Sequence, residues 1–157
     1  MSRYIFIASD YELPEIDLSG IMKLTVKDLK EMNPRPESFW DLDKLPDDCK
    51  TLFIPDGADT TGLQISICTN PPYGIEECIK KKYIYWLGGK FNLRCKRQFQ
   101  EYLQVNFDKG ANIELWSLWF GNDKMDEILQ KECSFSGIPR FDFEILWNTD
   151  CCITIIT

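Results

Sequence analysis

The alternation of hydrophobic and polar residues along the chain predicts a protein rich in β-strands. Residues 4–8 and 113–120 are apolar at both odd and even positions, apart from Glu114 and Ser117, which is typical of strands buried on both faces of a sheet. We expect both segments to be inner strands. Runs of β-branched and aromatic residues predict three further strands, at residues 51–54, 63–68 and 82–87.

Two segments carry the start and stop signals of α-helices. Thr25 and Asp28 have capping-box spacing, so a short helix should run to about residue 32, where Asn33-Pro34 ends it. Asn92 is a candidate N-cap for a longer helix that reaches about residue 108. The expected buried stripe of this longer helix consists of Cys95, Phe99, Tyr102, Leu103 and Phe107.

The last part of the chain predicts a terminal β-hairpin. Apolar and polar residues alternate over 141–147, and the β-branched residues 151–157 follow the turn signal at 148–150. Together these elements predict an α/β or α+β fold, a single globular domain spanning residues 1–157 with a mixed β-sheet of about six to seven strands and two or three helices. Strands 82–87 and 113–120 would flank a right-handed crossover if they were parallel neighbours.

Length and composition agree with one domain that has its own core. The chain has 157 residues, of which 44% are hydrophobic. No apolar run approaches the roughly 18 residues that a membrane span requires, so we expect no membrane contact. The first residues contain too short an apolar stretch for a secretory signal, and we expect a cytoplasmic protein.

Histidine is absent from the sequence, whereas cysteine occurs seven times. The usual general base near neutral pH is therefore missing, and we expect a protein without enzymatic activity. The cysteine spacings contain no C-x-x-C pair, so neither a metal site nor a cofactor is expected. Reduced thiols packed as small hydrophobes are the favoured interpretation, and Cys151 and Cys152 would point to opposite faces of their strand.

Charged residues are sorted into three blocks. Residues 1–60 carry 13 acids and 7 bases, residues 61–110 carry 4 and 8, and residues 111–157 carry 8 and 3. The acids of the first block gather in two loops, which could form a surface for a basic protein, with two aromatic residues as anchors. The candidate partner-binding residues are Asp10, Glu12, Glu15, Asp17, Phe39, Trp40, Asp41, Asp43, Asp47 and Asp48. A solvated loop surface is the competing interpretation.

The basic middle block suggests an alternative, an anion- or phosphate-binding regulatory site. A strand, a glycine pair and the start of a helix would bring together Gly88, Gly89, Lys90, Arg94 and Arg97. Cations at a helix N-terminus oppose the helix dipole, a cost that a bound anion would relieve. The competing interpretation is that these side chains extend into solvent or pair with the acids of the protein. Nucleic acid is disfavoured as a partner of a chain with net charge −7.

Three stretches, residues 4–15, 82–89 and 113–121, look like a group of small uncharacterised bacterial proteins. The whole arrangement resembles the immunity proteins of contact-dependent growth inhibition and related polymorphic toxins. This resemblance implies a cytoplasmic, non-enzymatic inhibitor that binds a cognate basic toxin domain, often a nuclease, and covers its active site. It assigns no residue. A cysteine-dependent enzyme stays open as a third alternative.

Overall fold

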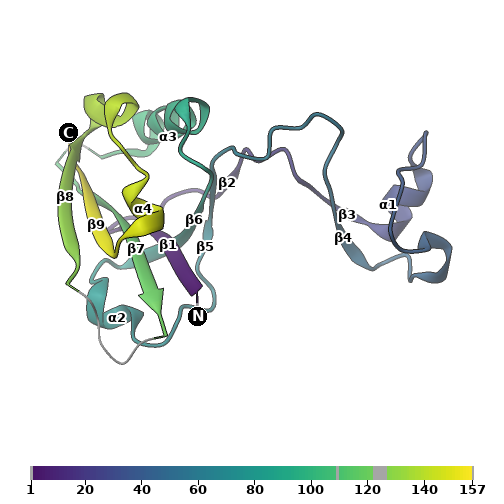
Figure 1. The fold of residues 1–157 in the computed structure, drawn as a ribbon, viewed down its shortest axis with the longest axis horizontal. Coiled ribbons are helices and arrows are strands. Elements are labelled where there is room, and N and C mark those ends of the chain that lie inside the picture. The colour runs from purple at the N-terminus through teal and green to yellow at the C-terminus, as the bar shows by residue number, and fades with distance from the viewer. Residues whose placement is uncertain (1, 109, 122–126, 157) are drawn as a thin grey trace. The chain divides into compact units, whose positions relative to one another are not determined.

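The structure is a computed structural model that describes residues 2–108, 110–121 and 127–156. The chain forms two compact units (Figure 1). The first unit consists of residues 1–19 and 61–157, and the second of residues 20–60. The expectation of one globular domain over residues 1–157 stays a prediction.

A seven-stranded mixed sheet forms the first unit. Its order across the sheet is β2 (Ile16–Asp17), β5 (Gln64–Ile67), β6 (Tyr83–Gly88), β1 (Ser2–Ser9), β7 (Ile113–Phe120), β9 (Cys151–Ile156) and β8 (Leu129–Ser134). Neighbouring strands are antiparallel except for β8 and β9, which are parallel. The predicted fold class, with a mixed sheet of six to seven strands and an α+β arrangement, is confirmed.

The two predicted inner strands, β1 and β7, are direct neighbours near the middle of the sheet. β1 pairs with β6 on its other side, and Phe6 stands opposite both Trp86 and Trp116. Since β6 and β7 are each antiparallel to β1, they are parallel to one another but are not neighbours. The predicted crossover from β6 to β7 therefore passes over β1.

One face of this sheet is covered by the helix α3 (Leu93–Asn106) (Figure 1). The side chain of Asn92 caps the helix by accepting a hydrogen bond from the Cys95 N–H at 2.9 Å. Four of the predicted stripe residues are buried against the sheet, and the fifth, Phe107, is partly buried there. The helix and its inward face are thus confirmed.

The opposite face carries an aromatic cluster and a one-turn helix, α2 (Ile75–Cys78), which was not predicted. Ile75 and Ile79 pack there with Phe6, Trp116 and other strand residues. Cys151 belongs to the cluster under α3 and Cys152 to the cluster under α2. Adjacent cysteines therefore point to opposite faces, as the period of a strand requires.

The predicted terminal hairpin is wrong. Residues 141–147 form no strand, but a turn followed by the short helix α4 (Ile145–Asn148), after the 3-10 helix η2 (Phe135–Arg140). The Asp142 carboxylate accepts a hydrogen bond from the Glu144 N–H at 3.0 Å, which bends the chain. Phe143 and Leu146, three residues apart, then become the buried side chains. The final strand β9 pairs instead with β7 and with the unpredicted strand β8.

The second unit is built on a two-stranded antiparallel sheet of β3 (Met22–Thr25) and β4 (Lys50–Phe53). The predicted helix between them is α1 (Val26–Glu31), and its capping box is formed, because Thr25 and Asp28 each bond the backbone N–H of the other. A 3-10 helix, η1 (Leu42–Lys44), lies between α1 and β4, within the second of the two predicted acidic loops. Val26, Leu29 and Leu42 form the small core.

Within the described ranges, no helix combines the length and the apolar composition that a membrane crossing needs.

Candidate functional site

The second predicted acidic loop is an ordered segment of the second unit. We call residues 37–48 the acidic segment. The Leu42 side chain is buried in the small core and holds η1 in place. The Asp41 carboxylate caps η1 by accepting a hydrogen bond from the Asp43 N–H at 3.2 Å. Two of the candidate residues, Phe39 and Trp40, come just before this cap.

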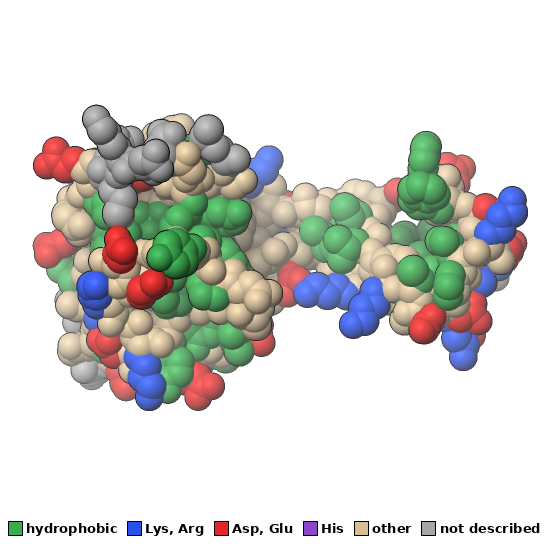
Figure 2. All heavy atoms as spheres, turned by 90° about the horizontal axis from the view of Figure 1, so that it is seen from below, with side chains coloured by type: hydrophobic (Ala, Val, Ile, Leu, Met, Phe, Trp, Pro, Cys, Tyr) green, Lys and Arg blue, Asp and Glu red, His purple; other side chains and the backbone are tan. Residues whose placement is uncertain are grey.

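Phe39 and Trp40 are exposed to a degree that is unusual for large aromatic side chains. Their side chains are 95% and 68% exposed, and their ring centroids lie 5.5 Å apart with nearly perpendicular planes. The Trp40 N–H donates to the Ser38 hydroxyl at 3.2 Å, which fixes the backbone beneath the rings. Figure 2 shows hydrophobic side chains protruding among charged ones on the unit of residues 20–60, to the right of the view.

Three of the five carboxylates in the acidic segment form ion pairs at the surface. Asp43 pairs with Arg35 at 3.2 Å, and Asp41 pairs with Lys44 at 3.3 Å. Asp47 pairs with Lys30 at 2.8 Å, and this hydrogen bond and charge hold the pKa of the Asp47 carboxyl below its usual value. All of these carboxylates are more than half exposed, so each pair is of the weak, solvent-screened kind.

Carboxylates of the first predicted loop mainly fasten the chain to its own unit. Asp10 pairs with Lys81 at 2.6 Å, and Glu15 accepts a hydrogen bond from the Ile67 N–H at 3.0 Å. Asp17 accepts from both the N–H and the hydroxyl of Ser19. Glu12 is exposed beside a surface pocket. The structure thus gives this loop a structural role that the sequence did not indicate, and it places the two acidic loops in different compact units.

The glycine pair of the predicted anion site is explained by packing. A Cβ on Gly89 would lie 2.7 Å from the Cys95 sulfur, and Gly89 has a φ of +114° that favours glycine. A Cβ on Gly88 would come within 3.1 Å of the Gln64 side chain. Both glycines therefore let strand β6 and helix α3 approach their neighbours closely. Anion binding at this turn stays a prediction.

The cations around this turn differ in their surroundings. Lys90, Arg94 and Arg97 are exposed, whereas Lys96, on the same turn of α3, donates to the Phe141 carbonyl at 2.6 Å. The Asn92 side chain already occupies the Cys95 N–H at the helix start. This cap therefore leaves fewer free N–H groups at the start of α3 to attract an anion.

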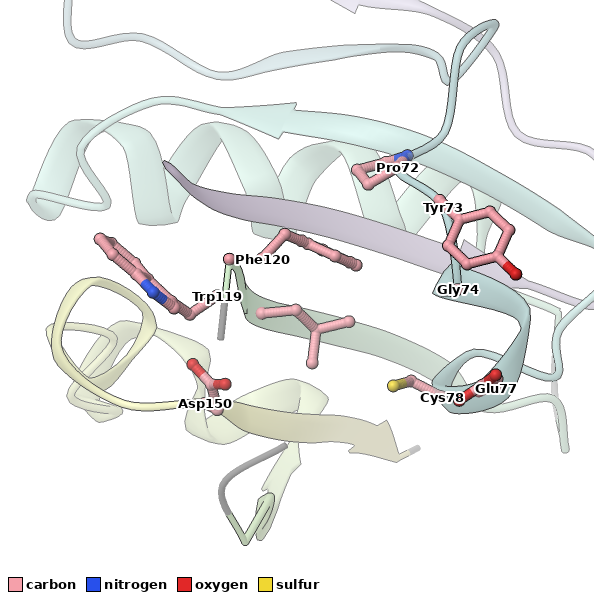
Figure 3. A pocket seen from close by; sticks show the side chains of 10 residues that line it. Pro72, Tyr73, Gly74, Glu77, Cys78, Trp119, Phe120 and Asp150 are labelled. Carbon is pink, nitrogen blue, oxygen red and sulfur yellow. The ribbon is translucent and has the colours of Figure 1, made fainter. Parts of the chain in front are cut away.

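A pocket of about 650 Å³ lies where β7 ends beside α2 (Figure 3). Its lining combines three aromatic side chains, two carboxylates and small or apolar groups. These residues are Pro72, Tyr73, Gly74, Glu77, Cys78, Leu118, Trp119, Phe120, Gly121 and Asp150. Burial raises the pKa of the Cys78 thiol, and the nearby Glu77 charge raises it further, so this thiol is held neutral. These surroundings disfavour the thiolate form that a cysteine nucleophile requires.

Asp150 of the pocket lining belongs to a polar network that the sequence did not reveal. Arg3 approaches Asp150 at 2.9 Å as an ion pair and donates a hydrogen bond to the Ser117 hydroxyl, also at 2.9 Å. The Ser117 hydroxyl in turn donates to the Leu146 carbonyl at 2.6 Å. Arg3 is more than a hundred positions from Ser117 and Asp150, and no local pattern could have joined them. The network ties β1 and β7 to the turn before β9.

No family model, curated protein or solved structure matches this chain. The resemblance to immunity proteins therefore stays a prediction. Among residues 2–108, 110–121 and 127–156, no group of three or more histidine, cysteine or acidic side chains is placed to hold a metal ion. The acidic segment combines two exposed aromatic rings with five acidic residues.

Proposed function

We propose that the chain is a non-enzymatic immunity protein, which binds a cognate basic toxin domain through the acidic segment and thereby neutralises it. The observation that carries this proposal is the exposure of Phe39 and Trp40 on an ordered loop. The folded chain leaves most of their hydrophobic surface in contact with water. Burial of this surface against a partner would be favourable.

The chemistry of these two side chains suits the centre of a protein interface. Tryptophan is enriched among the residues that contribute most to binding free energy, and such residues are typically surrounded by a polar rim. Here the rim is acidic. Residues 37–48 contain five acids and one base, Lys44. A basic surface on the partner would complement this charge, accelerate encounter and suppress wrong partners.

The ion pairs of the acidic segment are weak enough for a partner's basic side chains to replace the lysine and arginine side chains in them. Because the pairs that Asp41, Asp43 and Asp47 form are exposed, solvent screens them and each contributes little to stability. A partner could replace their lysine and arginine side chains with its own at little cost. Asp48, which makes no ion pair or hydrogen bond among the described residues, would be available without any exchange.

The favoured class of toxin is a nuclease, acting in the cytoplasm, where the inhibitor would meet it. A nuclease domain needs a positive surface to bind the phosphate backbone. An acidic inhibitor can occupy that same surface and exclude the substrate. A specific interface of this kind would bury roughly 1,600 Å² in total.

Capture from cells that produce the protein tests this proposal. The tagged chain should recover a basic partner at low salt and lose it progressively as salt is raised. The double variant Phe39→Ala/Trp40→Ala should recover far less. Tyr73→Ala is the matched control, since Tyr73 is an aromatic residue with 98% exposure in the other unit, and it should recover the partner normally. Failure to recover any basic partner, or equal recovery by all three chains, would contradict the proposal.

A further inference from the structure

The two edge strands of the seven-stranded sheet differ in length, and only the longer one could pair with a further strand over several residues. One edge is β2, which has only two residues. The other is β8, whose six residues contain neither proline nor glycine. β8 pairs one-to-one with β9, from Leu129 opposite Cys151 to Ser134 opposite Ile156, without a bulge. Proline, bulges, extreme shortness and charged side chains normally protect an edge, and β8 has only the last of these, as Lys131 and Glu132.

Among the described residues, no strand pairs with the outer edge of β8, so its outward backbone N–H and C=O groups could pair with another strand. Five of the six residues of β8 are exposed, and Cys133 is the buried one. Leu129, Lys131 and Cys133 share one face, since Cys133 packs in the cluster under α3, while Gln130, Glu132 and Ser134 point to the other face. Lys131 and Glu132, which carry opposite charges, are thus adjacent in sequence but lie on opposite faces of the strand.

This pattern opposes pairing with a second copy of the chain. Two β8 strands can join antiparallel only about a two-fold axis perpendicular to the sheet, and this axis keeps each face of one copy on the same side as that of the other. A residue can then stand opposite itself or a residue an even number of positions away. The two longest registers place Lys131 against Lys131 or Glu132 against Glu132, and no such register pairs Lys131 with Glu132. Like charges directly opposite each other are destabilising.

A strand from a different protein has no such restriction. We propose that β8 accepts an extended segment of a partner protein as an added antiparallel strand, with a basic residue opposite Glu132 and an acidic residue opposite Lys131. Such a segment can pair with all six residues and satisfy both charges. This binding site is independent of the acidic segment, and its test does not involve Phe39 or Trp40.

Two capped synthetic peptides of identical composition provide the probe. The complementary peptide contains Thr-Val-Lys-Glu-Thr-Val, which in antiparallel register from Ser134 to Leu129 places lysine opposite Glu132 and glutamate opposite Lys131. The control peptide contains Thr-Val-Glu-Lys-Thr-Val and places like charges opposite each other. Titration into the full chain, followed by NMR up to millimolar peptide, should show the complementary peptide binding about tenfold more tightly, because two cross-strand charge pairs change sign.

Hydrogen exchange and a charge-reversed chain complete the test. The complementary peptide should slow amide exchange within residues 129–134. The double variant Lys131→Glu/Glu132→Lys exchanges two exposed side chains, and it should bind the control peptide more tightly than the complementary one while keeping the circular dichroism of the wild type. Absence of binding by both peptides, equal binding of both, protection outside residues 129–134, or an unchanged preference in the charge-reversed chain would each overturn the proposal.

Discussion

The rings of Phe39 and Trp40 meet edge to face, with centroids 5.5 Å apart, and both are exposed. The next buried side chain along the chain is Leu42, three residues from Phe39. The ordered backbone therefore comes from Leu42 and the cap of η1, while the rings before it contribute their surface to the solvent. Because Leu42 holds the backbone in place and the two rings do not, substitutions can change the free energy of unfolding and the affinity for a partner independently.

We expect the variant Phe39→Ala/Trp40→Ala to keep the wild-type free energy of unfolding to within about 0.5 kcal/mol, because both side chains are exposed. Leu42→Ala should destabilise the second unit by about 2 kcal/mol or more, because it removes one of three buried side chains in a small core. Hydrogen exchange of residues 20–60 measures both effects. A double variant that exchanges as fast as Leu42→Ala would mean that the rings support the fold.

Gly89→Ala should destabilise the first unit more than Gly110→Ala does. Both glycines have positive φ, so both variants carry the strain of placing alanine in that region. Only at Gly89 does the new Cβ also meet the Cys95 sulfur, at 2.7 Å, while at Gly110 nothing lies within 4 Å. The difference between the two variants in chemical denaturation should be about 1 to 3 kcal/mol. Equal destabilisation would show that packing against α3 does not require the glycine.

Ser117→Ala should cost about 1 to 3 kcal/mol in the free energy of unfolding. The buried Ser117 hydroxyl accepts from Arg3 and donates to the Leu146 carbonyl, and alanine would leave that carbonyl without this donor. Ser66→Ala, an exposed serine on strand β5, is the control and should change stability by less than about 0.5 kcal/mol. Similar effects of the two substitutions in thermal and chemical denaturation would rule out a stabilising role for the network.

Stability should fall at alkaline pH because of two buried thiols. Burial raises the pKa of Cys151 to about 11 and that of Cys152 to about 12, from an ordinary value of 9.0. Above pH 9 the thiols ionise in the unfolded chain but stay protonated in the folded one, so ionisation stabilises the unfolded state and the free energy of unfolding falls as pH rises. Each thiol should contribute a loss of about 1.4 kcal/mol per pH unit until its folded pKa is reached.

Cys151→Ala and Cys152→Ala separate this effect from the titration of lysine and tyrosine. Each variant should show a shallower decline of the free energy of unfolding between pH 9 and 11 than the wild type, even where its stability at pH 7 is lower. The measurement is chemical denaturation at a series of pH values. Parallel curves for wild type and variants would show that the two thiols do not stay protonated in the folded state.

Most elements with strong local signals could be predicted from the sequence. The capping box at Thr25 and the Asn92 cap with its buried stripe both specify helices through neighbouring residues. Strands β1 and β7 are apolar on both faces because each is covered on both sides. In such elements the local pattern and the tertiary environment agree.

The wrong sequence predictions concern segments whose secondary structure is decided by tertiary contacts. Strand β8 is an edge strand with five exposed residues, and its polar sequence has no strand pattern. Residues 141–147 alternate like a strand, but Phe143 and Leu146 are the side chains buried, and the Asp142 turn and the helix α4 present them. Sequence pattern alone could not tell whether this segment would bury every second side chain, as a strand does, or side chains three residues apart, as a helix does.

For the acidic loops, the partner-binding role that the sequence suggests stays a prediction. Asp10, Glu15 and Asp17 hold the chain in place through contacts with distant or adjacent groups, which their composition does not indicate. Phe39 and Trp40 could equally have been buried, and their exposure became known only from the structure. The candidate site is therefore narrower than the sequence suggested and is limited to residues 37–48.

A growth assay tests the central claim most directly. The basic protein encoded beside this gene, or captured with it, is expressed in bacterial cells together with wild-type chain, Phe39→Ala/Trp40→Ala or Tyr73→Ala, at matched protein levels. Our account predicts that the basic protein alone arrests growth, that wild type and Tyr73→Ala restore growth, and that the double variant fails to do so. Normal protection by the double variant, or no growth arrest by the basic protein, would contradict the account.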